Sequence, residues 1–225
     1  MIMSSLAIIS FFIAPVLAAI ALFYLNVKYR LKTRRFLYLA FLFGLLSVVI
    51  VIVGQLLMDA TEINYLKNLK RTAFYAMVII AFGSELGKFI ILRYYFLIKK
   101  NFLGPVDGIV YSILLGLGFA TIACVLLGFG IISAEIDELY LLTFAVANVI
   151  FAIILGFFVG LGKTRQNRFI DSMTGLFAST IFHGLYTFSF LTKDPRLLLL
   201  FAIGSIIICI LLIYKAKNIP VFQDN

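Results

Sequence analysis

Seven apolar stretches, each long enough to cross a lipid bilayer, follow one another along this chain of 225 residues. A membrane-spanning helix needs about 20 consecutive apolar residues, because each residue adds only about 1.5 Å along the helix axis. We place the stretches at residues 4–27, 36–58, 73–98, 106–132, 140–162, 170–192 and 197–214. The chain is 64% hydrophobic and 13% charged, which leaves too few polar residues to cover a soluble domain of this size. The sequence therefore predicts an all-α polytopic membrane protein, with residues 1–225 forming a single integral membrane domain.

Cationic residues gather in alternate connectors, which lie on one side of the membrane if every stretch crosses it. They include Lys28, Arg30, Lys32, Arg34, Arg35, Lys99, Lys100, Lys163, Arg165, Arg168, Lys215 and Lys217. The acidic residues Glu135, Asp137 and Glu138 lie in a connector on the other side. The positive-inside rule then predicts an outside N-terminus and a cytoplasmic C-terminus. Because topology and contact with anionic membrane lipids account for the net charge of +9, we expect no nucleic-acid partner.

A few strongly polar residues lie deep inside the apolar stretches. Glu85 and Lys88 are near the middle of the third stretch, Asn148 is in the fifth and His183 is in the sixth. A charge at the bilayer centre costs roughly 2.5–3.5 kcal/mol, so it is rarely kept without a partner or a function. Counted from the outer ends of their stretches, Glu85, His183 and Asn148 are about 18, 14 and 12 Å deep. The sequence therefore predicts that separate helices bring these residues to one level, as a shared polar site requires.

Each of these residues also has a purely structural interpretation. Glu85 and Lys88 are three residues apart and can neutralise each other on one helix face. His183 can bridge two helices by hydrogen bonding without any catalytic role. Arg93, nearer the end of its stretch, is expected to extend to the headgroups. The residues alone leave both interpretations open.

In order along the chain, several segments resemble the motifs of the PrsW family of intramembrane proteases, which is related to the CAAX and Abi proteases. Residues 84–88 (SELGK) resemble the family pattern EExxK. Residues 105–111 (PVDGIVY) and 116–124 (GLGFATIAC) resemble P-x-D-G-x-x-Y followed by G-x-G-F-A-x-x-E-N. Residues 148–156 begin with an asparagine where the family usually has a histidine, and residues 183–188 (HGLYTF) resemble H-G-L-Y-D-F. Together these segments imply a helical, intramembrane peptidase fold.

The chain departs from the family pattern at four motif positions. Ser84 and Ala123 stand where the family has acidic residues, Asn148 replaces a histidine, and Thr187 replaces an aspartate. These replacements put the family's chemistry in question, so the sequence does not decide whether the protein is an enzyme.

The resemblance implies roles for six residues of this chain. Glu85 and His183 would be the catalytic residues, with Glu85 as the general base and His183 stabilising the developing oxyanion. The residues expected to support the site are Ser84, Lys88, Asn148 and Asp107. One carboxylate and one histidine fall short of the three protein ligands of a catalytic zinc, so we assign no metal ligands. Whether a divalent metal is a cofactor stays open.

Three classes of function follow. The resemblance implies an endopeptidase in the plasma membrane of a prokaryote that cuts a membrane-anchored, single-span protein such as an anti-sigma factor. The four replaced motif positions favour the alternative of a non-catalytic pseudoprotease or membrane scaffold that binds such a partner without cutting it. A transporter is a third possibility, since midspan charges also mark ion paths, but the chain shows no inverted repeat.

Overall fold

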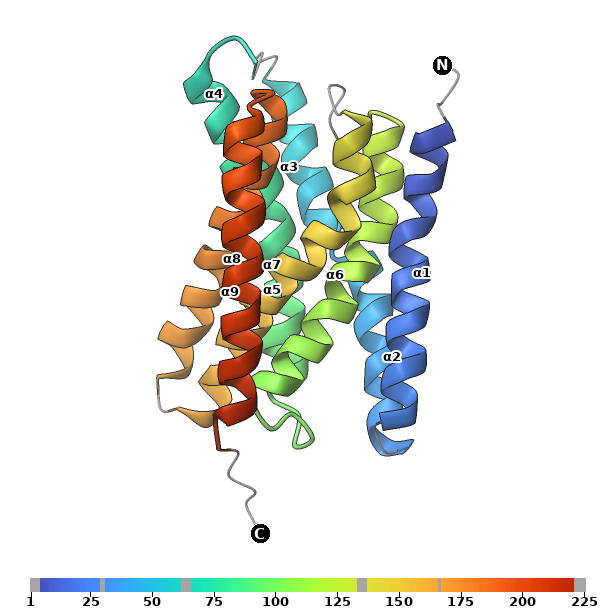
Figure 1. Cartoon of the computed structure of the whole chain (residues 1–225), viewed down its shortest axis with the longest axis vertical. Helices are drawn as coiled ribbons and strands as arrows, with labels where there is room; N and C mark the ends of the chain where they lie inside the picture. Colours follow the sequence, from blue (N-terminus) through green and yellow to red (C-terminus); the bar gives the residue numbers. More distant parts are fainter. Residues whose placement is uncertain (1–4, 29–30, 62–65, 133–136, 166, 221–225) are drawn as a thin grey trace.

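The computed structural model describes residues 5–28, 31–61, 66–132, 137–165 and 167–220, without the side chains of residues 31–33. The described residues form a bundle of long helices that run roughly side by side (Figure 1). The elements are α1 (Ser5–Lys28), α2 (Leu31–Leu46), α3 (Val49–Ala60), α4 (Leu69–Phe74), the π-helical η1 (Tyr75–Phe82), α5 (Gly83–Ile91), the π-helical η2 (Leu92–Phe96), α6 (Pro105–Gly128), α7 (Glu138–Thr164), α8 (Arg168–Leu191) and α9 (Pro195–Asn218). The predicted all-α architecture is confirmed.

Six stretches of helix within the described residues are long and apolar enough to cross a membrane. They correspond to the predicted stretches, except that α8, which covers the sixth, has the length but a more polar composition. Helix α1 begins at one end of the bundle and α9 ends at the opposite end (Figure 1). Residue 4, Arg30 and Glu135, which entered the sequence predictions, lie outside the described residues.

Two of the predicted stretches are not regular helices. The second is interrupted at Ser47, whose hydroxyl donates to the carbonyl of Gly44 at 2.7 Å, and the chain continues as α3. The third runs from α4 to η2 as one rod, and π-helical turns flank α5 on both sides. π-helical turns are rare and often occur at functional sites. Here they enclose the turn that carries the paired charges of the third stretch.

Glycines allow the central helices to approach closely. A Cβ on Gly108 of α6 would lie 2.1 Å from the carbonyl oxygen of Gly156 on α7, and one on Gly160 would lie 2.6 Å from the Cα of Pro105. In the same way, a Cβ on Gly118 would lie 2.2 Å from the backbone of α2. Small residues at such crossings are typical of helix packing in membranes. α6 and α7 therefore form the centre of the bundle.

Helix α8 has its polar side inside and its apolar side outside. Its buried residues include several serines and threonines together with His183, whereas Phe177 and Ile181 are more than half exposed. It packs against η1, α7 and α9, so its polar side chains face protein. This arrangement explains why α8 is more polar than the other long helices and why it still lies among them.

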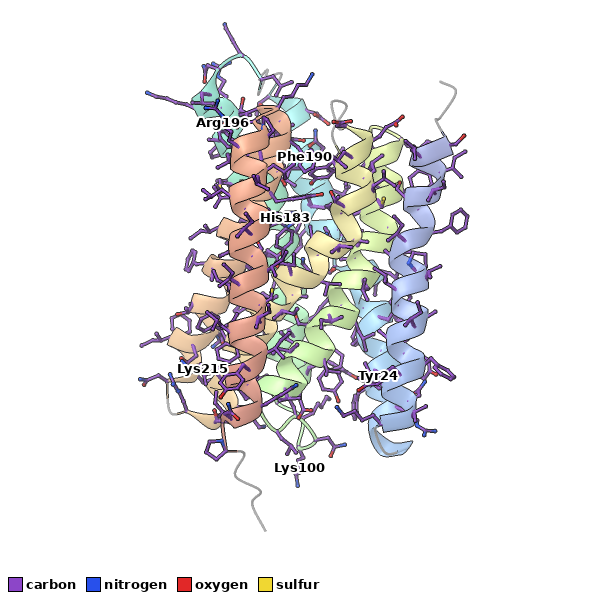
Figure 2. All side chains as sticks on the ribbon, viewed as in Figure 1. Tyr24, Lys100, His183, Phe190, Arg196 and Lys215 are labelled. Atoms are coloured by element: carbon purple, nitrogen blue, oxygen red, sulfur yellow. The ribbon has the colours of Figure 1, made fainter. Side chains whose placement is uncertain are left out.

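Cationic residues from two of the predicted basic segments lie at one end of the bundle. Figure 2 shows Lys100 and Lys215 at the end where the chain terminates, and Arg196 at the opposite end. His183 lies between these two ends (Figure 2). That the basic end of the bundle faces the cytoplasm stays a prediction.

Candidate functional site

The site begins with two charged residues on one face of α5. Glu85 and Lys88 are three residues apart, a spacing that places both side chains on the same side of a helix. Lys88 Nζ donates to Glu85 Oε1 at 2.5 Å, and both side chains have no exposed surface. Gly87, between them, lets the α2–α3 junction pack against α5, since a Cβ there would lie 2.4 Å from the Ser47 carbonyl oxygen. The pair is therefore enclosed by protein and kept from lipid.

Two further helices contribute one polar side chain each. Lys88 Nζ also donates to Asn148 Oδ1 on α7 at 3.1 Å. The Asn148 amide nitrogen donates to the Phe144 carbonyl at 3.0 Å, which orients the amide so that its oxygen faces the ammonium. His183 Nδ1 on α8 lies 2.9 Å from Glu85 Oε1. Residues from three helices thus form one continuous polar network.

Aromatic rings surround this network. The His183 imidazole stacks on Phe151, with centroids 4.5 Å apart and an interplanar angle of 14°. Lys88 Nζ lies 4.9 Å from the centroid of the Phe119 ring on α6, within range of a cation–π interaction. The rings exclude water and lower the local dielectric, which strengthens each charge–charge contact in the network.

Two atoms of the network have no hydrogen-bond partner among the described residues, namely Glu85 Oε2 and His183 Nε2. A carboxylate beside an ammonium accepts hydrogen bonds, so the imidazole nitrogen facing it, Nδ1, is the donor. A neutral imidazole protonated at Nδ1 carries a lone pair on Nε2. Both open atoms are therefore acceptors, and a molecule that suits them must donate hydrogen bonds.

The structure brings together four of the six predicted site residues, and two lie apart. The Ser84 hydroxyl is buried but donates to the Ile80 carbonyl of its own rod at 2.6 Å. Asp107 accepts from the Leu103 backbone N–H at 2.7 Å where α6 begins. Twelve residues of helix, about 18 Å, separate it from the part of α6 that contacts Lys88. Asp107 therefore stabilises the start of α6, and the Ser84 hydroxyl is bonded to the backbone of its own helical rod.

Phe119 and Phe151 were not identified as part of the site from the sequence. Phe151 follows Asn148 by three residues and so shares its helix face. This spacing could have identified Phe151 as a neighbour of the site from the sequence. Phe119 carries no such signal, because its contact with Lys88 depends on how α6 crosses α5.

The comparisons with known proteins identify a family for this chain. The model of a family described as PrsW family intramembrane metalloprotease matches residues 32–214. The chain belongs to this PrsW family. The matched segment contains all the polar residues of the site and all or most of every long helix except α1.

Curated relatives are similar over most of their length. The chain is 29% identical to the protein named Protease PrsW of Geobacillus kaustophilus (strain HTA426), over 84% of this chain and 81% of that protein. It is 27% identical to Protease PrsW of Oceanobacillus iheyensis, over 95% of this chain and 96% of the relative. It is also 27% identical to Protease PrsW of Shouchella clausii, over 92% and 94% of the two chains. No solved structure matches the chain.

The family's description implies a metal ion, and the residues of this PrsW-family site do not fit one. The described residues contain no group of three His, Cys, Asp or Glu side chains that could hold a metal. Glu85 Oε1 is already bonded to Lys88 and His183, which leaves one carboxylate oxygen and one imidazole nitrogen open. A catalytic zinc site has three protein ligands and a water. The site of this chain offers fewer donors and has an ammonium group among them.

Proposed function

We propose that this PrsW-family protein is a pseudoprotease that binds a membrane-anchored, single-span polypeptide. It does not hydrolyse this polypeptide by metal-dependent chemistry. The observation that carries the proposal is the small set of open donors, one carboxylate oxygen and one imidazole nitrogen, in a buried network that also holds the Lys88 ammonium. A peptidase must present a general base or a metal-bound water to its substrate. Here the carboxylate is neutralised by the lysine.

The partner class follows from the family. The relatives are named proteases and are similar over most of their length, which supports a polypeptide as the partner. A bacterial anti-sigma factor, which has one membrane span, is a suitable candidate for the partner. We place the protein in the plasma membrane of a prokaryote, with the basic end of the bundle in contact with anionic lipids.

A second candidate function, a metal-independent endopeptidase, is favoured by the open carboxylate oxygen of Glu85. A water that donates to Glu85 Oε2 would be oriented and polarised by this carboxylate, whose other oxygen is bonded to Lys88 and His183. Glu85 would take a proton from this water while its oxygen attacks the peptide carbonyl carbon. The same proton would then pass to the departing amide nitrogen, so that one water and one peptide bond are consumed.

Reconstitution with a panel of single-span anti-sigma proteins separates the two candidates. The purified protein in liposomes should crosslink to a partner and leave it intact, both with added Zn²⁺ and with a chelator. The matched control is the Glu85→Gln/His183→Ala double variant, which removes both candidate catalytic groups. Cleavage by the wild type that this variant lacks would establish the peptidase and refute the pseudoprotease. A proton-flux assay on the same liposomes tests the transporter, for which we expect no flux.

A further inference from the structure

The polar centre already contains a cation that belongs to the chain. Lys88 Nζ lies 2.5 Å from Glu85 Oε1 and 3.1 Å from Asn148 Oδ1, and the lysine side chain has no exposed surface. The Phe119 ring adds a third favourable contact at 4.9 Å. The ammonium is thus held by a carboxylate, an amide oxygen and an aromatic face from three helices.

We propose that the Lys88 ammonium is the resident cation of this centre and that it excludes divalent metal ions from it. A divalent ion would have to share the single carboxylate with the ammonium, and like charges that close repel strongly where water is excluded. The positive charge beside Glu85 is carried by the Lys88 side chain, which is covalently part of α5. This inference goes beyond the proposed function, because it holds whether the protein cleaves its partner or only binds it.

Removing the ammonium should convert the centre into a metal site. Glu85 Oε1 and Asn148 Oδ1 both lie within 3.1 Å of the lysine nitrogen, so its loss leaves two oxygen donors facing one position. His183 Nδ1, at 2.9 Å from the same carboxylate oxygen, adds an imidazole ligand once its proton moves to Nε2. A carboxylate, an amide oxygen and an imidazole suit Zn²⁺ or Co²⁺, which accept mixed nitrogen and oxygen ligands. The loss of the ammonium also leaves Glu85 as a buried, uncompensated anion that a metal ion would neutralise.

The test compares wild type with Lys88→Met and Lys88→Gln, each purified in detergent. Bound Zn²⁺ is measured by elemental analysis, and Co²⁺ is added as a probe whose visible absorption reports its coordination. Wild type should hold no stoichiometric metal and show no Co²⁺ spectrum. At least one neutral variant should bind about one Co²⁺ per chain, and Zn²⁺ should raise its melting temperature, since a ligand that binds only the folded state stabilises it.

The Glu85→Gln/Lys88→Met double variant is the matched control. It keeps the centre neutral and removes the carboxylate, so it should fold and bind no Co²⁺. A wild type that binds one Zn²⁺ or Co²⁺ and loses it on His183→Ala would overturn the proposal. So would folded Lys88→Gln and Lys88→Met proteins of which neither binds metal. If neither single variant folds without metal but one folds when Zn²⁺ is present, the proposal is supported.

Discussion

His183 on α8 and Glu85 on α5 lie 98 residues apart in the chain and share a hydrogen bond of 2.9 Å at the buried centre of the bundle. Glu85 Oε1 also accepts a hydrogen bond from Lys88, so this one oxygen links the histidine of α8 to the lysine of α5.

The first prediction concerns the buried ion pair. Glu85→Gln leaves the Lys88 ammonium buried without its counter-charge, which should cost about 3–5 kcal/mol of folding stability. Thermal unfolding in detergent should therefore show a marked drop in the melting temperature. Glu138→Gln changes an exposed carboxylate in the same way and should leave the melting temperature nearly unchanged. Equal effects of the two substitutions would contradict a structural role for the pair.

A second prediction concerns the amide on α7. Asn148→Leu keeps a side chain of similar size but removes the acceptor of Lys88, and an unsatisfied buried donor costs about 1–3 kcal/mol. Chemical denaturation should show this loss. Asn218→Leu makes the same chemical change at an exposed position near the end of α9 and serves as the control. If Asn148→Leu is as stable as wild type, the amide contributes nothing to the network.

A third prediction tests the close approach of α6 and α7. Gly108→Ala would place a Cβ 2.1 Å from the Gly156 carbonyl oxygen, so the two backbones must separate. Overpacking of this kind costs about 1–3 kcal/mol, and the melting temperature should fall. Gly204→Ala on α9 meets nothing within 4 Å and should be neutral or slightly stabilising. A tolerated Gly108→Ala would show that the crossing is looser than described.

The fourth prediction is the orientation in the membrane. Cys124 and Cys209 are buried and can be replaced first to give a cysteine-free background. Lys100→Cys and Arg196→Cys then place single thiols at exposed positions on opposite ends of the bundle. An impermeant thiol reagent should label Arg196→Cys in intact cells and label Lys100→Cys only after the membrane is opened. The reverse pattern would show that the basic end faces outward, against the positive-inside rule.

Much of the site could be predicted from the sequence because membrane burial is a local constraint. Glu85, Lys88, Asn148 and His183 are conspicuous in apolar surroundings, and a rise of about 1.5 Å per residue places them at one depth. Ser84 and Asp107 were assigned to the site by resemblance, and the structure places both elsewhere. The depth of a residue in the membrane, or its position in a motif, does not determine which way its side chain faces.

The sequence by itself determined where the membrane-spanning stretches lie, which connectors are basic and at what depth the polar residues stand. Insertion into a bilayer depends on the hydrophobicity of each segment taken alone, so these features can be predicted locally. Only the tertiary structure decided that Lys88 bridges Glu85 and Asn148, and that Phe151 covers His183. Those contacts depend on the rotation and crossing of α5, α7 and α8, which are set by close backbone packing between helices distant in the chain.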